Sequence, residues 1–80
     1  MRVTIYGRTE PKCVWCDRAK RLAVDKGLEM VFNDIVDPMV KADLLSRVPG
    51  VKTVPQIFVD NTHVGGYEDF ENYIMEKNYD

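Results

Sequence analysis

The residues best suited to chemistry in this chain are its two cysteines, which form the motif Cys13-Val14-Trp15-Cys16. Cysteines three positions apart lie on one face of a helical turn, where their sulfur atoms can form a disulfide. If a helix begins at Cys13, unpaired backbone N–H groups and the positive end of the helix dipole stabilise its thiolate. A thiolate with a second thiol beside it attacks a foreign disulfide, and the neighbour then releases the product. The spacing therefore predicts thiol–disulfide exchange, with Cys13 as the nucleophile and Cys16 as the resolving residue.

Size and charge narrow the class of protein. The chain has 80 residues, so we expect one domain spanning residues 1–80, and a monomer. A net charge of −2 argues against nucleic-acid binding through phosphate contacts. Two cysteines are too few for a disulfide-stapled secreted scaffold, and no stretch resembles a signal peptide or a membrane span. We therefore expect a cytoplasmic protein with no membrane partner.

Hydrophobic periodicity and breaker residues predict the elements that must position the cysteines. Each predicted helix or strand is bounded by glycine, proline or polar turn residues. The order predicts an α/β fold, βαβαββα, with a four-stranded mixed sheet, three helices on its two faces and an initial βαβ unit with parallel strands. The predicted strands are residues 2–6, 29–35, 54–59 and 63–64, and the predicted helices are residues 13–26, 37–48 and 67–77. The apolar positions expected to mark the buried faces are Val14, Ala19, Leu22 and Ala23 in the first helix, Val40, Leu44, Leu45 and Val48 in the second, and Phe70, Tyr73 and Ile74 in the third.

Three motifs together indicate a family. They are the cysteine motif, the segment Thr53-Val54-Pro55-Gln56-Ile57-Phe58, and the segment Gly65-Gly66-Tyr67-Glu68-Asp69. Along nearly its whole length the chain resembles a glutaredoxin of the thioredoxin-fold superfamily, and it is similar to the short phage-type and bacterial dithiol glutaredoxins. The resemblance implies a thioredoxin-like fold and glutathione as the reducing co-substrate.

The same resemblance implies a set of glutathione-binding residues. It implies a cis peptide bond before Pro55 that turns the backbone of Val54, after Thr53, toward the cysteine pair and pairs it with glutathione. Gly66, Tyr67 and Glu68, at the start of the last helix, would hold the γ-glutamyl end. Lys12 and Lys52 are the main candidates for the glycyl carboxylate of glutathione, Arg8 is a third, and Trp15 would lie beside the substrate.

Three positions depart from the family pattern. Val14 stands where the family usually has proline, and residues between the cysteines tune the redox potential and the thiol pKa. Glu68 stands where the family usually has aspartate, and Glu10 occupies the place of a basic residue. His63, the only histidine, is assigned a structural role because thiol–disulfide exchange needs no histidine base.

The predicted function is a glutathione-dependent thiol–disulfide oxidoreductase that reduces protein disulfides and glutathione mixed disulfides, with ribonucleotide reductase as a possible client. Resolution by Cys16 and resolution by a second glutathione both remain open. One alternative is recycling by thioredoxin reductase, and another is an inactive binding module on the same fold. A third is an iron–sulfur cluster carrier that uses Cys13 and glutathione in a dimer, whereas the main prediction needs no metal. Two thiols cannot complete a closed zinc site in one monomer.

Overall fold

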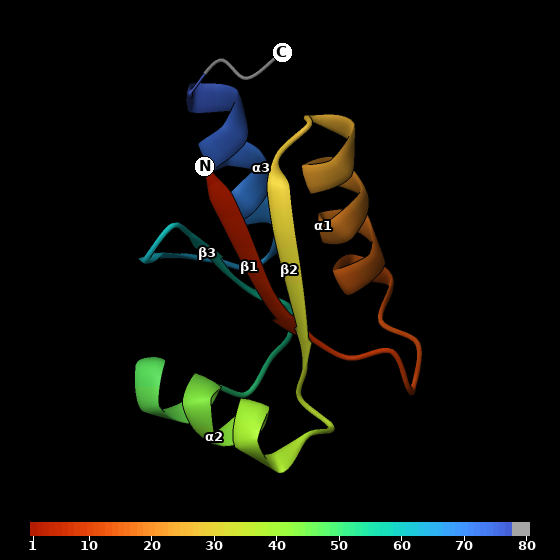
Figure 1. Ribbon diagram of the computed structural model, residues 1–80, viewed down its shortest axis with the longest axis vertical. Helices are drawn as coiled ribbons and strands as arrows, with labels where there is room; N and C mark the ends of the chain where they lie inside the picture. The colour runs from red at the N-terminus through yellow and green to blue at the C-terminus, as the bar shows by residue number, and fades with distance from the viewer. Residues whose placement is uncertain (78–80) are drawn as a thin grey trace.

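The computed structural model describes residues 1–77 and has the predicted βαβαββα order of elements. In Figure 1 the chain runs from a central strand through α1 and back along a neighbouring strand before it reaches α2. The bounds are β1 Arg2–Gly7, α1 Val14–Asp25, β2 Glu29–Asp34, α2 Pro38–Arg47, β3 Gln56–Val59, β4 Thr62–Gly65 and α3 Tyr67–Glu76.

The four strands form one mixed sheet in the order β2-β1-β3-β4. Strands β1 and β2 are parallel, as expected for two strands joined by a helical crossover. Strand β3 is antiparallel to both β1 and β4. The sheet therefore confirms the predicted thioredoxin-like architecture, with β1 at its centre next to β3.

Both faces of the sheet are covered by helices. On one face, α1 and α3 lie side by side, whereas α2 lies apart from them (Figure 1). The larger core lies under α1 and α3 and consists of Val3, Ile5, Ala19, Ala23, Ile57, Val59, Phe70 and Ile74. The smaller core, on the α2 side, consists of Tyr6, Leu44 and Phe58. Within residues 1–77, no helix has both the length and the apolar character that a bilayer crossing requires.

Two apolar residues expected to face the core are exposed. Val14 is 51% exposed and Leu45 is 42% exposed. Successive helical residues are rotated by about 100° from each other, so Leu45 lies beside the buried stripe on which Leu44 lies. In α1 the buried residues are Cys16, Ala19 and Ala23, so the stripe begins at a cysteine and not at Val14.

Strand β3 begins at Gln56 and not at residue 54, as the sequence pattern predicted. Pro55 has no backbone N–H with which to join the ladder, so strand pairing starts after it. The two residues before Gln56 consequently form a separate segment ahead of the strand, and Val54 lies beside Cys13, where α1 begins.

Candidate active site

The cysteine pair lies where α1 begins. Cys13 is the N-cap residue, with an extended backbone, and its Sγ accepts a hydrogen bond from the backbone N–H of Cys16 at 3.3 Å. Cys13 and Cys16 form a disulfide, with their Cα atoms 5.2 Å apart. Cys13 is 6% exposed and Cys16 is fully buried. The predicted pairing is confirmed, and Cys13 is the cysteine of the pair that retains some exposed surface.

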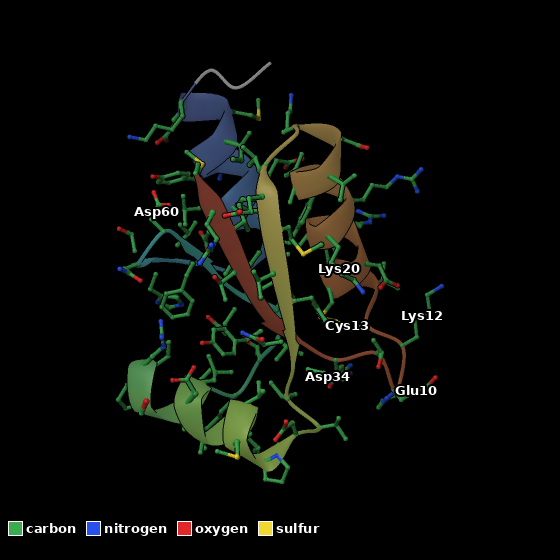
Figure 2. All side chains as sticks on the ribbon, in the orientation of Figure 1. Glu10, Lys12, Cys13, Lys20, Asp34 and Asp60 are labelled. Carbon is green, nitrogen blue, oxygen red and sulfur yellow. A yellow bond between two sulfur atoms is a disulfide. The ribbon has the colours of Figure 1, made fainter. Side chains whose placement is uncertain are left out.

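The pair lies at the end of the sheet where β1 and β2 both finish. In Figure 2, Cys13 is at this end and Asp60, in the turn between β3 and β4, is near the other. Ligand sites in sheets with parallel strands favour this carboxyl-terminal edge. Gly7, the last residue of β1, lies against the pair, because a Cβ built there would be 2.8 Å from Cys16 Sγ and 3.0 Å from a ring carbon of Phe32.

The segment before β3 lies against the cysteine pair. The Val54–Pro55 peptide bond is cis, as the resemblance implied, and the Glu10–Pro11 bond is also cis. The carbonyl oxygen of Val54 lies 4.0 Å from Cys13 Sγ. A disulfide sulfur carries no proton, so this approach is a contact and not a hydrogen bond. The backbone of Val54 is therefore beside the sulfur of Cys13, the more exposed cysteine of the pair.

A first cleft, which we call the α3 cleft, lies beside this segment. It has a volume of about 250 Å³, and Trp15 and Tyr67 stand close together in its wall, with ring centroids 5.7 Å apart. Seven of its eight lining residues were predicted from the sequence. The lining residues are Trp15, Thr53, Val54, Pro55, Gly66, Tyr67, Glu68 and Asp69.

Asp69 is the lining residue that the sequence analysis did not assign. Its Oδ2 accepts a hydrogen bond from the backbone N–H of Gly66 at 3.2 Å, which is the acidic half of a capping box at the start of α3, since Gly66 has no side chain to supply the other half. An acidic residue three positions after the N-cap is the sequence signal that identifies this role. With the Gly66 N–H occupied, the N–H groups of Tyr67, Glu68 and Asp69, in the first turn, are the backbone donors that the helix itself does not use.

Tyr67 stays protonated at neutral pH. Burial, followed by the nearby Glu71 carboxylate, raises the pKa of Tyr67. Its hydroxyl donates to Glu71 Oε2 at 3.2 Å. The cleft wall formed by this ring therefore carries no negative charge of its own.

A second cleft, which we call the basic cleft, lies on the α2 side of Thr53 and Val54. It has a volume of about 550 Å³ and is lined by Arg8, Ile35, Lys41, Leu44, Val51, Lys52, Thr53 and Val54. Two of the proposed cationic residues, Arg8 and Lys52, line it. Lys41 was not predicted, although it lies one turn before the inward-facing Leu44 and so shares its side of α2.

Lys12 is placed differently from Arg8 and Lys52. It is exposed, and it is not among the residues that line either cleft. Figure 2 shows Lys12 and Glu10 on the outer side of the loop that precedes Cys13. Within residues 1–77, no three His, Cys, Asp or Glu side chains gather into a group that could hold a metal ion.

A disulfide-forming cysteine pair at a helix start, beside a cis-proline segment on a thioredoxin-like sheet, defines a thiol–disulfide oxidoreductase. A family model described as Glutaredoxin matches residues 3–64. The chain is 46% identical over 83 residues to Glutaredoxin 1 of Salmonella typhimurium, a match that covers 95% of this chain and 93% of that one. The chain belongs to the glutaredoxin family.

Solved structures give the same result for the fold. The structure of reduced Escherichia coli glutaredoxin matches with a TM-score of 0.79 and 38% identity, over 95% of each chain. A buckwheat glutaredoxin–glutathione complex matches with a TM-score of 0.76 over 96% of this chain and 71% of that one. At 22% identity, the buckwheat match shows the shared fold alone.

Proposed function

We propose that this chain is a glutathione-dependent thiol–disulfide oxidoreductase that reduces protein disulfides and glutathione mixed disulfides. One observation carries the proposal: the sulfur of Cys13, the more exposed cysteine of the pair, lies against Val54, and Val54 together with Thr53 lines both clefts. A tripeptide thiol bound there can extend in both directions from the reacting sulfur.

Reaction begins with the reduced pair. The Cys13 thiolate is the N-cap of α1, so the backbone N–H of Cys16 and the helix dipole favour its negative charge. It attacks one sulfur of the substrate disulfide, forms a mixed disulfide and expels the other sulfur as a thiolate.

The mixed disulfide can be resolved by two routes. In the first, Cys16 loses its proton and attacks Cys13 Sγ, which releases the bound partner as a thiolate and leaves the Cys13–Cys16 disulfide. In the second, an external glutathione thiolate attacks the glutathionyl sulfur and regenerates Cys13 with release of glutathione disulfide. The Cys13–Cys16 disulfide that the first route leaves is then reduced by two glutathione molecules, which are themselves oxidised to glutathione disulfide.

The two clefts suit the two ends of glutathione. The cysteinyl backbone of glutathione would pair with Val54 as an added strand. Its γ-glutamyl end would occupy the α3 cleft, where the backbone N–H groups of Tyr67 and Glu68 would bind its carboxylate and the Glu68 side chain would pair with its ammonium group. Its glycyl carboxylate would lie in the basic cleft, near Lys52, Arg8 and Lys41.

The physiological setting follows from the chemistry. The cycle requires a reducing compartment with abundant glutathione, for which we propose the cytoplasm. Disulfide-containing proteins are the clients, and ribonucleotide reductase is a candidate among them. We propose that the chain acts as a monomer.

The test is glutathione-coupled reduction of a small glutathione mixed disulfide by the wild type, Cys13→Ser and Cys16→Ser. Cys13→Ser removes the nucleophile, so turnover should fall on the order of 10³-fold or more. Cys16→Ser should retain turnover on this substrate if a second glutathione resolves the adduct, and should lose it if Cys16 is required. A wild type that turns over with thioredoxin reductase and NADPH but not with glutathione would contradict the proposal.

A further inference from the structure

Three polar side chains link strand β4 to the segment beside the cysteine pair. His63 Nε2 lies 2.8 Å from Gln56 Oε1. Gln56 Nε2 in turn lies 3.0 Å from the carbonyl oxygen of Thr53 and 3.2 Å from its Oγ1. The chain of contacts therefore runs from the sheet edge to the residue that precedes Val54.

The direction of each hydrogen bond can be assigned. The carbonyl oxygen of Thr53 can only accept, so the amide NH₂ of Gln56 must face Thr53. The amide oxygen of Gln56 then faces His63, and an oxygen there can only accept. Neutral His63 must therefore carry its proton on Nε2 and donate it to Gln56.

Burial makes this arrangement consequential. Gln56 is 8% exposed, and among the described residues it is the buried one with a polar side chain, whereas the others in the core are apolar. A buried amide group that lacks a hydrogen-bond partner keeps the full cost of its removal from water. The arrangement in which every polar atom of the Gln56 amide has a partner is therefore strongly favoured. His63 satisfies the amide oxygen, which leaves both N–H groups of the amide for Thr53.

His63 is itself held in place by packing. Its ring lies 5.0 Å from that of Phe58, centroid to centroid, and Phe58 and His63 are paired across β3 and β4. Phe58 is buried and packs edge-to-face on Tyr6 at 5.6 Å. An exposed histidine is thus fixed in orientation by the smaller core.

We propose that His63 and Gln56 are positioning residues for the disulfide exchange reaction. They hold Thr53, which lines both clefts, and through it the Val54 backbone that lies 4.0 Å from Cys13 Sγ. The inference rests on the proposed function, because the wall so positioned is the one on which glutathione would dock. The sequence predicted a purely structural role for His63. The proposal instead gives His63 an effect on the active site, exerted through Gln56.

The first test needs no catalytic activity. In ¹⁵N-labelled oxidised protein, two-bond nitrogen–hydrogen correlations identify which imidazole nitrogen carries the proton. We expect the Nε2–H tautomer of His63, together with side-chain amide protons of Gln56 that exchange more slowly than those of exposed Asn61. An Nδ1–H tautomer, or a Gln56 amide that exchanges as fast as that of Asn61, would overturn the inference.

The second test separates the donor from the ring. His63→Phe keeps an aromatic ring against Phe58 but has no donor, whereas His63→Gln places an amide N–H the same number of bonds from the backbone. We expect His63→Phe to raise KM for a glutathione mixed disulfide by about two- to tenfold with kcat nearly unchanged, the effect of one lost neutral hydrogen bond. His63→Gln should return KM to near the wild-type value, and Thr62→Ala, at an exposed position of the same strand, serves as the control.

The outcomes distinguish this inference from the function on which it rests. If the wild type does not turn over with glutathione, the proposed function fails, and the tautomer and amide exchange still decide whether the positioning network exists. If the wild type is active but His63→Phe matches it in KM, the inference alone is wrong. It is also wrong if His63→Gln is impaired as much as His63→Phe, because the donor would then not be the cause.

Discussion

The three cations of the basic cleft come from three different parts of the chain. Arg8 follows β1, Lys41 lies in α2, and Lys52 precedes the Thr53–Pro55 segment. Arg8 also braces its loop, since its Nε donates to the carbonyl oxygen of Pro11 at 3.0 Å. A single exposed ammonium group contributes little to binding a carboxylate in water, so we expect these groups to share the interaction.

The shared interaction predicts how lysine variants behave. Lys41→Ala and Lys52→Ala should each raise KM for a glutathione mixed disulfide by about two- to fivefold, as expected for partly exposed ion pairs. Lys12→Ala should leave KM within about twofold of the wild type, because Lys12 lines neither cleft. Steady-state kinetics at low and high salt is the measurement, and the difference between variants should shrink as salt screens the charges. Equal effects of Lys12→Ala and Lys52→Ala would contradict the assignment.

At the scale of elements, α2 is held to the sheet by a hydrogen bond as well as by packing. The Tyr6 hydroxyl, on β1, donates to Asp43 Oδ2 on α2 at 2.5 Å. Asp43 also pairs with Arg47, one turn later, at 3.3 Å. The Tyr6 hydrogen bond, supported by Arg47, lowers the pKa of Asp43, while burial and the same hydrogen bond raise the pKa of Tyr6.

This contact predicts a pH dependence of stability. A carboxyl group whose pKa is lowered by folding stabilises the native state above its unfolded pKa of about 3.9, and that contribution is lost as pH falls through the folded value. The free energy of unfolding, measured in urea from about pH 5 down to about pH 2, should therefore fall less steeply for Tyr6→Phe than for the wild type. Asp43→Asn should flatten the same range, and the double variant should flatten it no further. Parallel curves for the wild type and Tyr6→Phe would exclude the contact as the source.

The order of the elements was predictable because each is delimited by local signals. Asp37 accepts from the N–H of Met39 at the start of α2, with Pro38 in the first helical position, and Gly27, at φ +69°, follows the end of α1. Residues whose role depends on how helices and strands pack beside one another were not predictable in this way. Lys41 reaches the cleft only because α2 packs beside the Thr53–Val54 segment, and the role of His63 depends on a register in which β4 pairs with β3.

At the scale of the whole molecule, one helix serves both the core and the site. The start of α3 forms a wall of the α3 cleft, and Phe70 and Ile74, further along the helix, are buried against α1 and the sheet. The cleft is therefore anchored by the larger core. The position of Tyr67 relative to Cys13 depends on that packing and not on α3 alone.

Neighbouring residues of α3 provide a matched test of this anchoring. Ile74 is 1% exposed, whereas Met75 is 69% exposed. Ile74→Val should lower the free energy of unfolding by about 1 kcal/mol, through one lost buried methylene and the space it leaves. Met75→Ala should change it by less than about 0.5 kcal/mol, as is usual for a surface position. Urea unfolding monitored by Trp15 fluorescence measures both, and comparable losses would contradict the placement of α3.

The close approach of Gly7 to Cys16 restricts how this protein can diversify. No side chain fits at position 7 without displacing the resolving sulfur or the ring of Phe32. Val14 and Trp15, between the cysteines, are each more than half exposed, so substitutions there can retune the reduction potential without displacing the buried sulfur. Libraries that vary these two positions and keep Gly7 unchanged should yield folded proteins across a range of potentials.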